Sequence, residues 1–280
     1  MNANLERAYL RFVVWLNRKA KSAAVRLTHL TGKSKVPMHP KHLISTGEDE
    51  KWYMGYVQPG MRVLDVGSAN GVHSRRVAQQ ASQVVGMEYL WHDVQVARGL
   101  NDAERVTNVA FALDNVEQGI AIADNQFDLV MFFDVIEHLY RRVDVLREIG
   151  RVMHADGMLL VSAPNRATSW KQRLAAAGLF YYTDPDHKIE YTWDDFLVEL
   201  RAGGFEPITE PIPIVVDTPW AGLIDLVGGF WLAPYRRLCE WKAQVAQEMP
   251  EESIGWQVVC RRIPSPPPPA MHDTARNEAV

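Results

Sequence analysis

The chain has 280 residues, 47% of them hydrophobic and 23% charged, which is enough to bury a full core in one large domain. A formal net charge of −4 argues against nucleic acid as the main partner. The two cysteines, Cys239 and Cys260, form neither a metal-binding pair nor a disulfide framework, so we expect a reducing, cytoplasmic setting. The longest apolar stretch, 220–234, is interrupted by Asp225 and is too short to span a bilayer.

Residues 4–30 predict one amphipathic helix, because apolar residues recur at steps of three and four with basic residues between them. Residues 1–42 hold nine Lys and Arg against one acid, Glu6. This helix either lies on an anionic membrane surface, with Phe12 and Trp15 inserted, or docks by its apolar stripe as a lid or dimer contact. We favour the lid or dimer contact, because basic amphipathic helices are common in proteins without a membrane function.

Strands and helices alternate from residue 61 onward. We expect strands at 61–66, 83–88, 108–114, 127–133 and 157–163, and helices at 71–81, 93–100, 143–153 and 193–202. This order predicts a mostly parallel sheet with helices on both faces.

The C-terminal part of the chain departs from this alternation. Three prolines place 205–216 near a sheet edge or a bulge, and 254–262 is the expected final strand. Between them, a Trp- and Gly-rich insertion at about 217–253 either covers a binding site or forms a helical pair packed on the core. We therefore expect a basic N-terminal helix at 1–42, a main domain at 43–263 and a disordered Pro-rich tail at 264–280.

The strongest local motif is Val-Leu-Asp-Val-Gly-Ser-Ala-Asn-Gly at 63–71, in which a strand delivers Asp65 to a glycine turn that opens a helix. Glycines allow a close approach of the backbone to a ligand, and the helix N-terminus offers unpaired N–H groups. A dinucleotide site is disfavoured, because Ala69 and Val72 replace two of its three glycines and Asp65 would repel a pyrophosphate. A ligand with an amino group and a sulfonium would suit that carboxylate, and a tight turn without a ligand is the remaining alternative.

Three further strand ends carry polar residues. Glu88 ends the second strand, 23 residues after Asp65, where an acid can accept both hydroxyls of a ribose. Asp114 ends the third strand and either accepts from an adenine amino group or caps the next helix. The fourth strand runs into a loop with two acids and His138, at the edge where such sheets bind ligands.

Taken together, these motifs and the segment LREIGRVMHADGMLLVSAPN resemble the class I S-adenosylmethionine-dependent methyltransferase superfamily, and most of all its small-molecule and glycan-modifying branch. The likeness covers about residues 50–207. It departs from the pattern at Ala69, where a glycine is usual, and at Ala155-Asp156-Gly157, where Pro-Gly-Gly is usual. The resemblance implies a Rossmann-like, seven-stranded, mostly parallel sheet of order 3-2-1-4-5-7-6, with helices on both faces and an antiparallel last strand. The main domain is then the methyltransferase domain.

The resemblance also implies the cofactor, S-adenosylmethionine, and the residues that bind it, with no metal. The glycine turn would hold the methionine part, the second and third strand ends would hold the ribose and the adenine, and the backbone after the fourth strand would hold the methionine amino group. The expected cofactor residues, in chain order, are Asp65, Gly67, Ser68, Gly71, Glu88, Tyr89, Asp114, Asn115, Phe132 and Phe133.

Methyl transfer to a hydroxyl needs a base, and two histidines are candidates. His138 lies in the loop that some sugar O-methyltransferases of the resembled family use; alternatively it only bonds and packs within the loop, which we slightly favour. His187 precedes Thr192 in a segment that relatives often place over the acceptor; alternatively it lies in a turn before a helix that Thr192 caps. Tyr181, Tyr182 and Tyr191 would either line the same pocket or simply pack.

These observations favour O-methylation of a sugar, a lipid-linked glycan or another small metabolite. N-methylation of a small amine and a catalytically silent cofactor-binding partner protein stay open as alternatives. A nucleic-acid methyltransferase is disfavoured, because the Asn/Asp-Pro-Pro-aromatic motif of the amino-directed enzymes is missing after the fourth strand. We expect a cytoplasmic protein, with peripheral contact at the inner membrane surface and a homodimer both left open.

Overall fold

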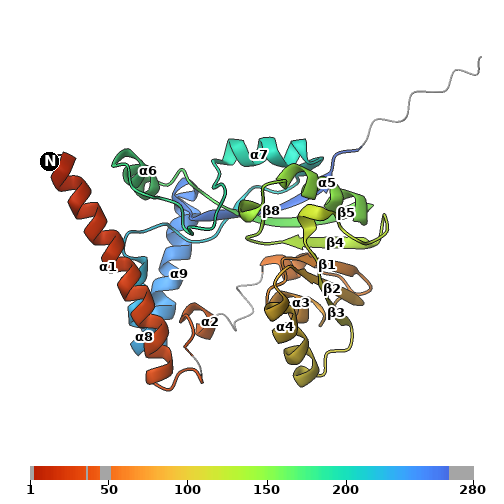
Figure 1. The fold of residues 1–280 in the computed structure, drawn as a ribbon, viewed down its shortest axis with the longest axis horizontal. Helices are drawn as coiled ribbons and strands as arrows, with labels where there is room; N and C mark the ends of the chain where they lie inside the picture. The colour runs from red at the N-terminus through yellow and green to blue at the C-terminus, as the bar shows by residue number, and fades with distance from the viewer. Residues whose placement is uncertain (1–2, 36, 45–51, 265–280) are drawn as a thin grey trace, which may run out of the picture.

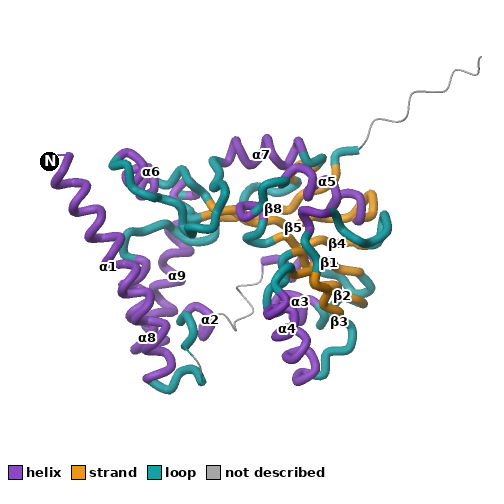
Figure 2. Tube along the Cα trace, viewed as in Figure 1, coloured by secondary structure: helices purple, strands orange, loops and turns teal. Residues whose placement is uncertain are grey.

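The computed structural model describes residues 3–35, 37–44 and 52–264, so nearly all of the expected Pro-rich tail lies outside the described residues. Its centre is one eight-stranded sheet flanked by helices (Figures 1 and 2). The strands are β1 (Arg62–Val66), β2 (Gln83–Glu88), β3 (Val109–Leu113), β4 (Phe127–Phe132), β5 (Met153–Pro164), β6 (Phe205–Pro207), β7 (Ile212–Pro213) and β8 (Gly255–Arg262).

The strand order is β3-β2-β1-β4-β5-β8-β6, with β7 also paired to β8. Strands β1 to β5 are mutually parallel, and β8 runs antiparallel to β5 and β6. This confirms the order and the antiparallel last strand expected from the sequence. One position differs in detail: the Pro-rich run 205–216 forms two short strands instead of one, since proline cannot donate to a ladder.

Helices cover both faces of the sheet, as expected. They are α1 (Ala3–Leu30), α2 (Lys41–Ile44), α3 (Val72–Val77), α4 (Trp91–Glu104), α5 (Arg142–Val152), α6 (Ser169–Ala176), α7 (Trp193–Ala202), α8 (Ala221–Phe230) and α9 (Leu232–Glu248). Short 3-10 turns lie at η2 (Trp52–Tyr56), η3 (Val116–Gln118), η4 (Ile136–His138) and η5 (Pro250–Glu252). Helices α5 and α7 lie on one face and α3 and α4 on the other (Figure 1).

Two apolar clusters explain this layering. The β4 run Phe-Asp-Leu-Val-Met-Phe sends Val130 and Phe132 to the α5 and α7 side, and Leu129 and Met131 to the α3 and α4 side. All four side chains are fully buried. Successive side chains of a strand point to opposite faces of the sheet. Because helices cover both faces of this parallel sheet, nearly every residue of β4 must be apolar, whichever face it points to.

The insertion forms the helical pair that was one of its two expected forms, but the pair packs on α1 instead of on the sheet core. We call α1, α8 and α9 the helical arm (Figure 1). A Cβ at Gly222 would lie 2.1 Å from the backbone O of Asn17, and a Cβ at Gly229 would lie 2.8 Å from Cβ of Leu27. The contacts advance in the same direction along both helices, so α1 and α8 run parallel and touch closely through glycine.

The arm lies beyond the carboxyl ends of the parallel strands. Helix α6, which follows β5, contacts α1 through Arg173 and Glu6, whose side chains are 3.0 Å apart. Nε2 of His39 lies 3.0 Å from the carboxylate of Asp225 on α8, and α9 leads through η5 back into β8. Within the described ranges, no helix combines the length and apolar character needed to span a membrane.

We expect Gly222→Ala to destabilise the protein by about 1–3 kcal/mol, because the new methyl group meets backbone that cannot rotate away. Gly99→Ala is the matched control: it lies in the exposed interior of α4 with open space around it, and should stabilise by about 0.5–1 kcal/mol. Urea unfolding followed by circular dichroism measures both. Equal stability of the two variants would contradict the close crossing of α1 and α8.

Candidate active site

The turn after β1 is held in left-handed backbone conformations. The φ angles are 75° at Gly67, 45° at Ala69 and 72° at Gly71, and Gly71 is the N-cap of α3. The two glycines adopt these angles at little cost, whereas an alanine with positive φ costs about 1–2 kcal/mol. Ala69, where the sequence departs from the usual glycine, is therefore a strained residue in the middle of the turn.

Neighbouring side chains leave no room for a Cβ at either glycine. A Cβ at Gly67 would lie 2.3 Å from Cγ2 of Val135, in the loop after β4. A Cβ at Gly71 would lie 2.3 Å from Cζ of Phe111 on β3. The turn is thus packed directly against the β3 and β4 ends. The sequence analysis did not identify Phe111 or Val135 as part of this site.

Asp65, on β1, is bonded to the helix that follows the turn. Its side chain is only 3% exposed and accepts a hydrogen bond from Oγ of Ser74 on α3 at 2.5 Å. Burial, with a smaller contribution from the charge of Glu88, raises the pKa of Asp65 to about 6. Asp65 therefore fixes the start of α3 by its bond to Ser74, and little of its carboxylate is open to a ligand.

Glu88 ties the second strand end to the glycine turn. One carboxylate oxygen accepts from the backbone N–H of Ala69 at 3.0 Å, and the other accepts from those of Tyr89 and Leu90 at 2.8 and 2.9 Å. The side chain of Tyr89 is 68% exposed. Glu88 thus sets the position of the turn while its carboxylate stays at the edge of the sheet.

The third strand end brings Asp114 to the same edge. Its backbone N–H donates to the backbone O of Glu88 at 2.9 Å. The side chain that caps the following turn η3 is that of Asn115, which accepts from the N–H of Glu117 at 3.1 Å. The capping alternative considered for Asp114 therefore applies to its neighbour.

An aromatic cluster stands beside the end of β4. The ring of Phe133 lies 5.5 Å from Trp52, 5.3 Å from Tyr53 and 5.7 Å from His73. The hydroxyl of Tyr53 lies 2.7 Å from Nδ1 of His73. Phe132 points into the core, so only its backbone faces this region. Trp52, Tyr53 and His73 were missed by the sequence analysis, although the aromatic run ahead of β1 was a visible signal.

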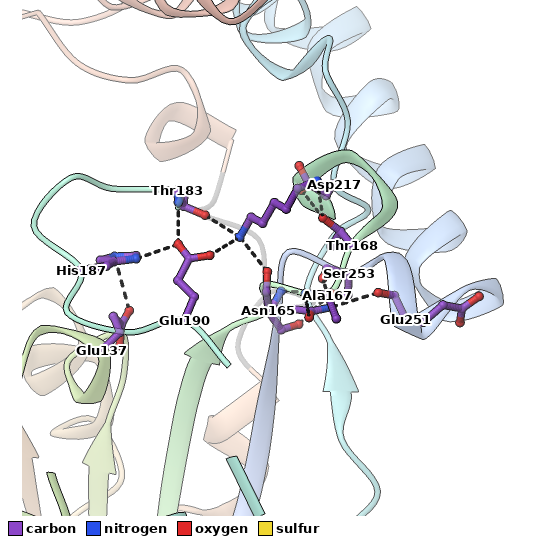
Figure 3. A network of polar contacts seen from close by, with 12 residues as sticks. Glu137, Asn165, Ala167, Thr168, Thr183, His187, Glu190, Asp217, Glu251 and Ser253 are labelled. Carbon is purple, nitrogen blue, oxygen red and sulfur yellow. Dashed lines mark hydrogen bonds and ion pairs between the residues drawn. The ribbon is translucent and has the colours of Figure 1, made fainter. Parts of the chain in front are cut away.

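Both candidate bases come together at the loop after β4. The rings of His138 and His187 are 4.7 Å apart and meet edge to face. Nδ1 of His187 lies 2.8 Å from Oε1 of Glu190, and Nε2 lies 3.9 Å from Oε1 of Glu137 (Figure 3). His187 is therefore held by a carboxylate on one ring nitrogen, while its other ring nitrogen faces the loop that carries His138.

A buried ion pair supports this arrangement. Glu190 is fully buried and accepts from Nζ of Lys171 at 2.5 Å and from the N–H of Thr183 at 2.5 Å. Burial alone would raise the pKa of Glu190, but hydrogen bonds from His187 and Lys171 outweigh it and lower the pKa. With Glu190 ionised, Nδ1 of His187 is the donor to it, which fixes the tautomer of the ring.

Glu137 completes the cluster. It is 2% exposed, and its Oε2 has no hydrogen-bond partner among the described residues. Burial, and next the charge of Asp134, raise the pKa of Glu137 to about 8, so this carboxyl is mostly protonated at neutral pH. Glu137, His138 and His187 offer one ligand atom each within 4.8 Å of one another, a set that could hold a metal ion.

Tyrosines near the cluster differ in their surroundings. Tyr191 is fully buried in the core, and its ring packs 5.1 Å from Phe196, so it lines no pocket. Tyr181 and Tyr182 are half-buried, with ring centroids 5.0 Å apart. As one of the two interpretations had it, Thr192 caps α7, accepting from the N–H of Asp195 at 3.1 Å.

Comparison with known proteins now decides the family. A family model described as a methyltransferase domain matches residues 57–204. The chain belongs to this methyltransferase family. It has the Rossmann-like sheet order of the class I members, and membership of this family implies S-adenosylmethionine as the cofactor.

Similar proteins agree with this assignment. A "Ubiquinone biosynthesis O-methyltransferase" of Azorhizobium caulinodans is 29% identical over 153 residues, which are 52% of this chain and 59% of that relative. The chain thus spans less than two thirds of the length of this curated relative. A solved structure of a putative methyltransferase from Bacillus halodurans has a TM-score of 0.52 at 18% identity, covering 78% of this chain and all of that one.

A second solved structure shows the breadth of the fold. The [4+2]-cyclase SpnF has a TM-score of 0.53 at 19% identity, covering 74% of this chain and 76% of that one. At such identities the likeness shows the fold alone. The three helices of the helical arm all lie outside the residues that the family model matches.

The site residues fit the methyltransferase cofactor. Oγ of Ser68 is buried and has no hydrogen-bond partner in the described part of the chain, and it lies above Gly86, where a Cβ would approach it to 2.9 Å. A buried hydroxyl without a partner is costly unless a ligand bonds to it. Together with Glu88 and Asp114 at the adjacent strand ends, it forms a polar edge that suits a ligand carrying an amino group and ribose hydroxyls.

We expect Ala69→Gly to stabilise the methyltransferase by about 1 kcal/mol, because glycine relieves the positive φ at this position. The reverse change at a matched position, Gly71→Ala, should destabilise it by about 2 kcal/mol or more, since φ is positive and Phe111 occupies the space. Chemical denaturation with cofactor absent measures both. A neutral or destabilising Ala69→Gly would show that the turn is not left-handed there.

Proposed function

We propose that this methyltransferase methylates a hydroxyl group of a small or lipid-linked acceptor. The observation that supports this most is the meeting of His138 and His187 at the end of β4, with Glu190 bonded behind His187. A hydroxyl acceptor must lose a proton during transfer, and a histidine held by a carboxylate is suited to accept one. An amine acceptor need only arrive unprotonated and would not require this arrangement.

We propose that the cofactor residues are those expected from the sequence. The backbone of Gly67 and Gly71 and the hydroxyl of Ser68 would hold the methionine part, with the backbone at Phe132 and Phe133. Asp65 would act through Ser74 by fixing the helix start. Glu88 and the exposed Tyr89 would lie at the ribose, and Asp114 and Asn115 at the adenine.

Within the histidine pair, we propose His138 as the base and His187 as a positioning residue. Both histidines are half-buried, but the ring nitrogens of His187 face Glu190 at 2.8 Å and Glu137 at 3.9 Å, which leaves His138 as the one to meet an acceptor. Burial, and next the charge of His187, lower the pKa of His138, so it is neutral near pH 7. S-adenosylmethionine supplies an already activated methyl group, so the remaining task of the protein is to align the acceptor and take its proton.

The acceptor class is also a proposal. The curated relative is named for O-methylation in ubiquinone biosynthesis, which supports a hydroxyl acceptor with an apolar portion alongside the sugars, lipid-linked glycans and small metabolites considered first. We propose a cytoplasmic protein, with homodimerisation still open. A catalytically silent cofactor-binding protein is the alternative, since a fold by itself does not establish methyl transfer.

We expect methyl-labelled S-adenosylmethionine to transfer label into an extract of the source cells when the purified protein is added. Solvent partition then separates lipid-linked acceptors from soluble ones, and mass spectrometry of the product locates the methylated atom. Glu88→Ala, with cofactor affinity reduced at least tenfold by calorimetry, is the negative control. Cofactor binding without any label transfer would contradict the enzyme proposal, and label on nitrogen would replace hydroxyl by amine methylation.

With the acceptor identified, we expect His138→Ala to lower kcat by about 100-fold or more. The wild-type kcat/KM should rise with pH and level off above an apparent pKa below 6.5, since the pKa of His138 is lowered and only its neutral form accepts a proton. This fall in activity at low pH should vanish in His138→Ala and persist in His154→Ala. His154 lies near the amino-terminal end of β5, at the opposite end of the strands from His138. Loss of activity in EDTA, restored by a divalent cation, would instead make the cluster a metal site.

A further inference from the structure

Helix α1 exposes large apolar side chains along its first half. Leu5 is 62% exposed, Phe12 56% and Trp15 53%, and the rings of Phe12 and Trp15 stack with centroids 6.0 Å apart. Exposed single hydrophobic residues are ordinary, but a run of them on one helix marks an interaction surface. These side chains are left uncovered by the packing of α1 on α8, so they are free to meet a surface outside the chain.

The apolar face of α1 is divided between two surroundings. Leu10, Val13, Ala20 and Ala24 are buried, and Ala24 lies at the close contact with α8. The exposed set lies on another line, since residues seven apart face the same way after two turns of a helix. That line reads Leu5, Phe12, Lys19, Arg26, so it passes from apolar to basic along the helix.

Charge gathers on the same part of the chain. Residues 1–42 hold nine basic residues and one acid, a net charge of +8. Since the whole chain has a net charge of −4, residues 43–280 have a net charge of −12. Lys19 and Arg26 are exposed, as are Arg11 and Arg18 beside them. A basic helix face attached to an acidic body is oriented by a negatively charged surface.

Helix α8 adds aromatic residues at both of its ends. Trp220 is 46% exposed, Phe230 43% and Trp231 62%. The only charged residue between them, Asp225, is engaged by His39 and by the hydroxyl of Tyr235 at 3.0 Å. Tryptophan and phenylalanine at the ends of an apolar helix are typical of the boundary between lipid headgroups and acyl chains.

We propose that the helical arm docks on the surface of an anionic lipid bilayer. Leu5, Phe12 and Trp15 enter the headgroup region, and the basic residues of α1 contact lipid phosphates. A second copy of the chain fits this face poorly, because the exposed charges Arg11, Arg18, Lys19 and Arg26 are all basic and the acid of α1, Glu6, is already bonded to Arg173. The bilayer supplies both the negative charge and the apolar layer that this face lacks.

Docking would bring the methyltransferase site toward the membrane. The arm lies beyond the carboxyl ends of the strands, and α6, which carries Lys171 of the histidine cluster, contacts α1 through Arg173 (Figure 1). Docking on a bilayer favours a lipid-linked acceptor among those of the proposed function, and only this choice of acceptor rests on that function. Membrane binding itself needs no methyl transfer, so the two can fail separately.

The test is co-sedimentation of the full chain with vesicles of phosphatidylcholine alone or with 30% phosphatidylglycerol. We expect at least tenfold tighter binding to the anionic vesicles, weakened by salt. Phe12→Ser with Trp15→Ser should reduce binding tenfold or more, and Lys19→Glu with Arg26→Glu should abolish the preference for phosphatidylglycerol. The matched controls are Val198→Ser and Arg201→Glu on α7, which covers one face of the sheet apart from the helical arm (Figure 1); both should bind as the wild type.

Folding is checked in each variant by its thermal stabilisation on adding S-adenosylmethionine, which should be unchanged. Failure of the wild type to bind either vesicle overturns the proposal, as does equal loss of binding in the α7 controls. A dimer in analytical ultracentrifugation that Phe12→Ser dissociates, without vesicle binding, would make this face an interface between copies. Capture of label only in water-soluble products, with vesicle binding intact, would reject the lipid-linked acceptor and keep the membrane surface.

Discussion

The buried pair of Lys171 and Glu190 is the interaction on which the geometry of the His138–His187 cluster, the proposed catalytic half of the site, depends. It joins α6 to the segment before α7, and Nζ of Lys171 also donates to the backbone O of Asn165 at the end of β5. Removing one partner of such a pair leaves an uncompensated buried charge, at a cost of about 3–5 kcal/mol. The pair also orients the ring of His187, because Glu190 accepts a hydrogen bond from its Nδ1.

A second carboxylate has the same role on the proposed cofactor side. Glu88 accepts three backbone N–H groups, one of which belongs to Ala69 in the glycine turn. The turn and the start of α4 are therefore positioned by one side chain at the edge of the sheet. In both halves of the site, a carboxylate fixes backbone or ring geometry from behind, so that the groups facing the ligand are held in place before it arrives.

The helical arm shows that the chain has joined a separate helical unit to a common fold. Its parts, α1 and the α8–α9 pair, are far apart in sequence and are closed together by glycines at the crossing. That closeness uses one side of α1 and leaves another side exposed, with aromatic residues first and basic residues after. The basic α1 is attached to an acidic remainder of the chain, so positive and negative charge are separated within the molecule.

The sequence by itself determined the sheet, because hydrophobic periodicity and the glycine turn are local, and the order of the strands followed from the resemblance those motifs carry. It also named His138, His187 and Glu88 from their positions at strand ends or in loops. Only the tertiary structure brought His187 onto His138, placed Glu190 and Lys171 behind them, and turned Tyr191 into the core, because such contacts join segments whose relative placement no local pattern encodes. The pairing of α1 with α8 was hidden for the same reason: an amphipathic stripe shows that a helix has an apolar face, but not how much of that face its own chain will cover.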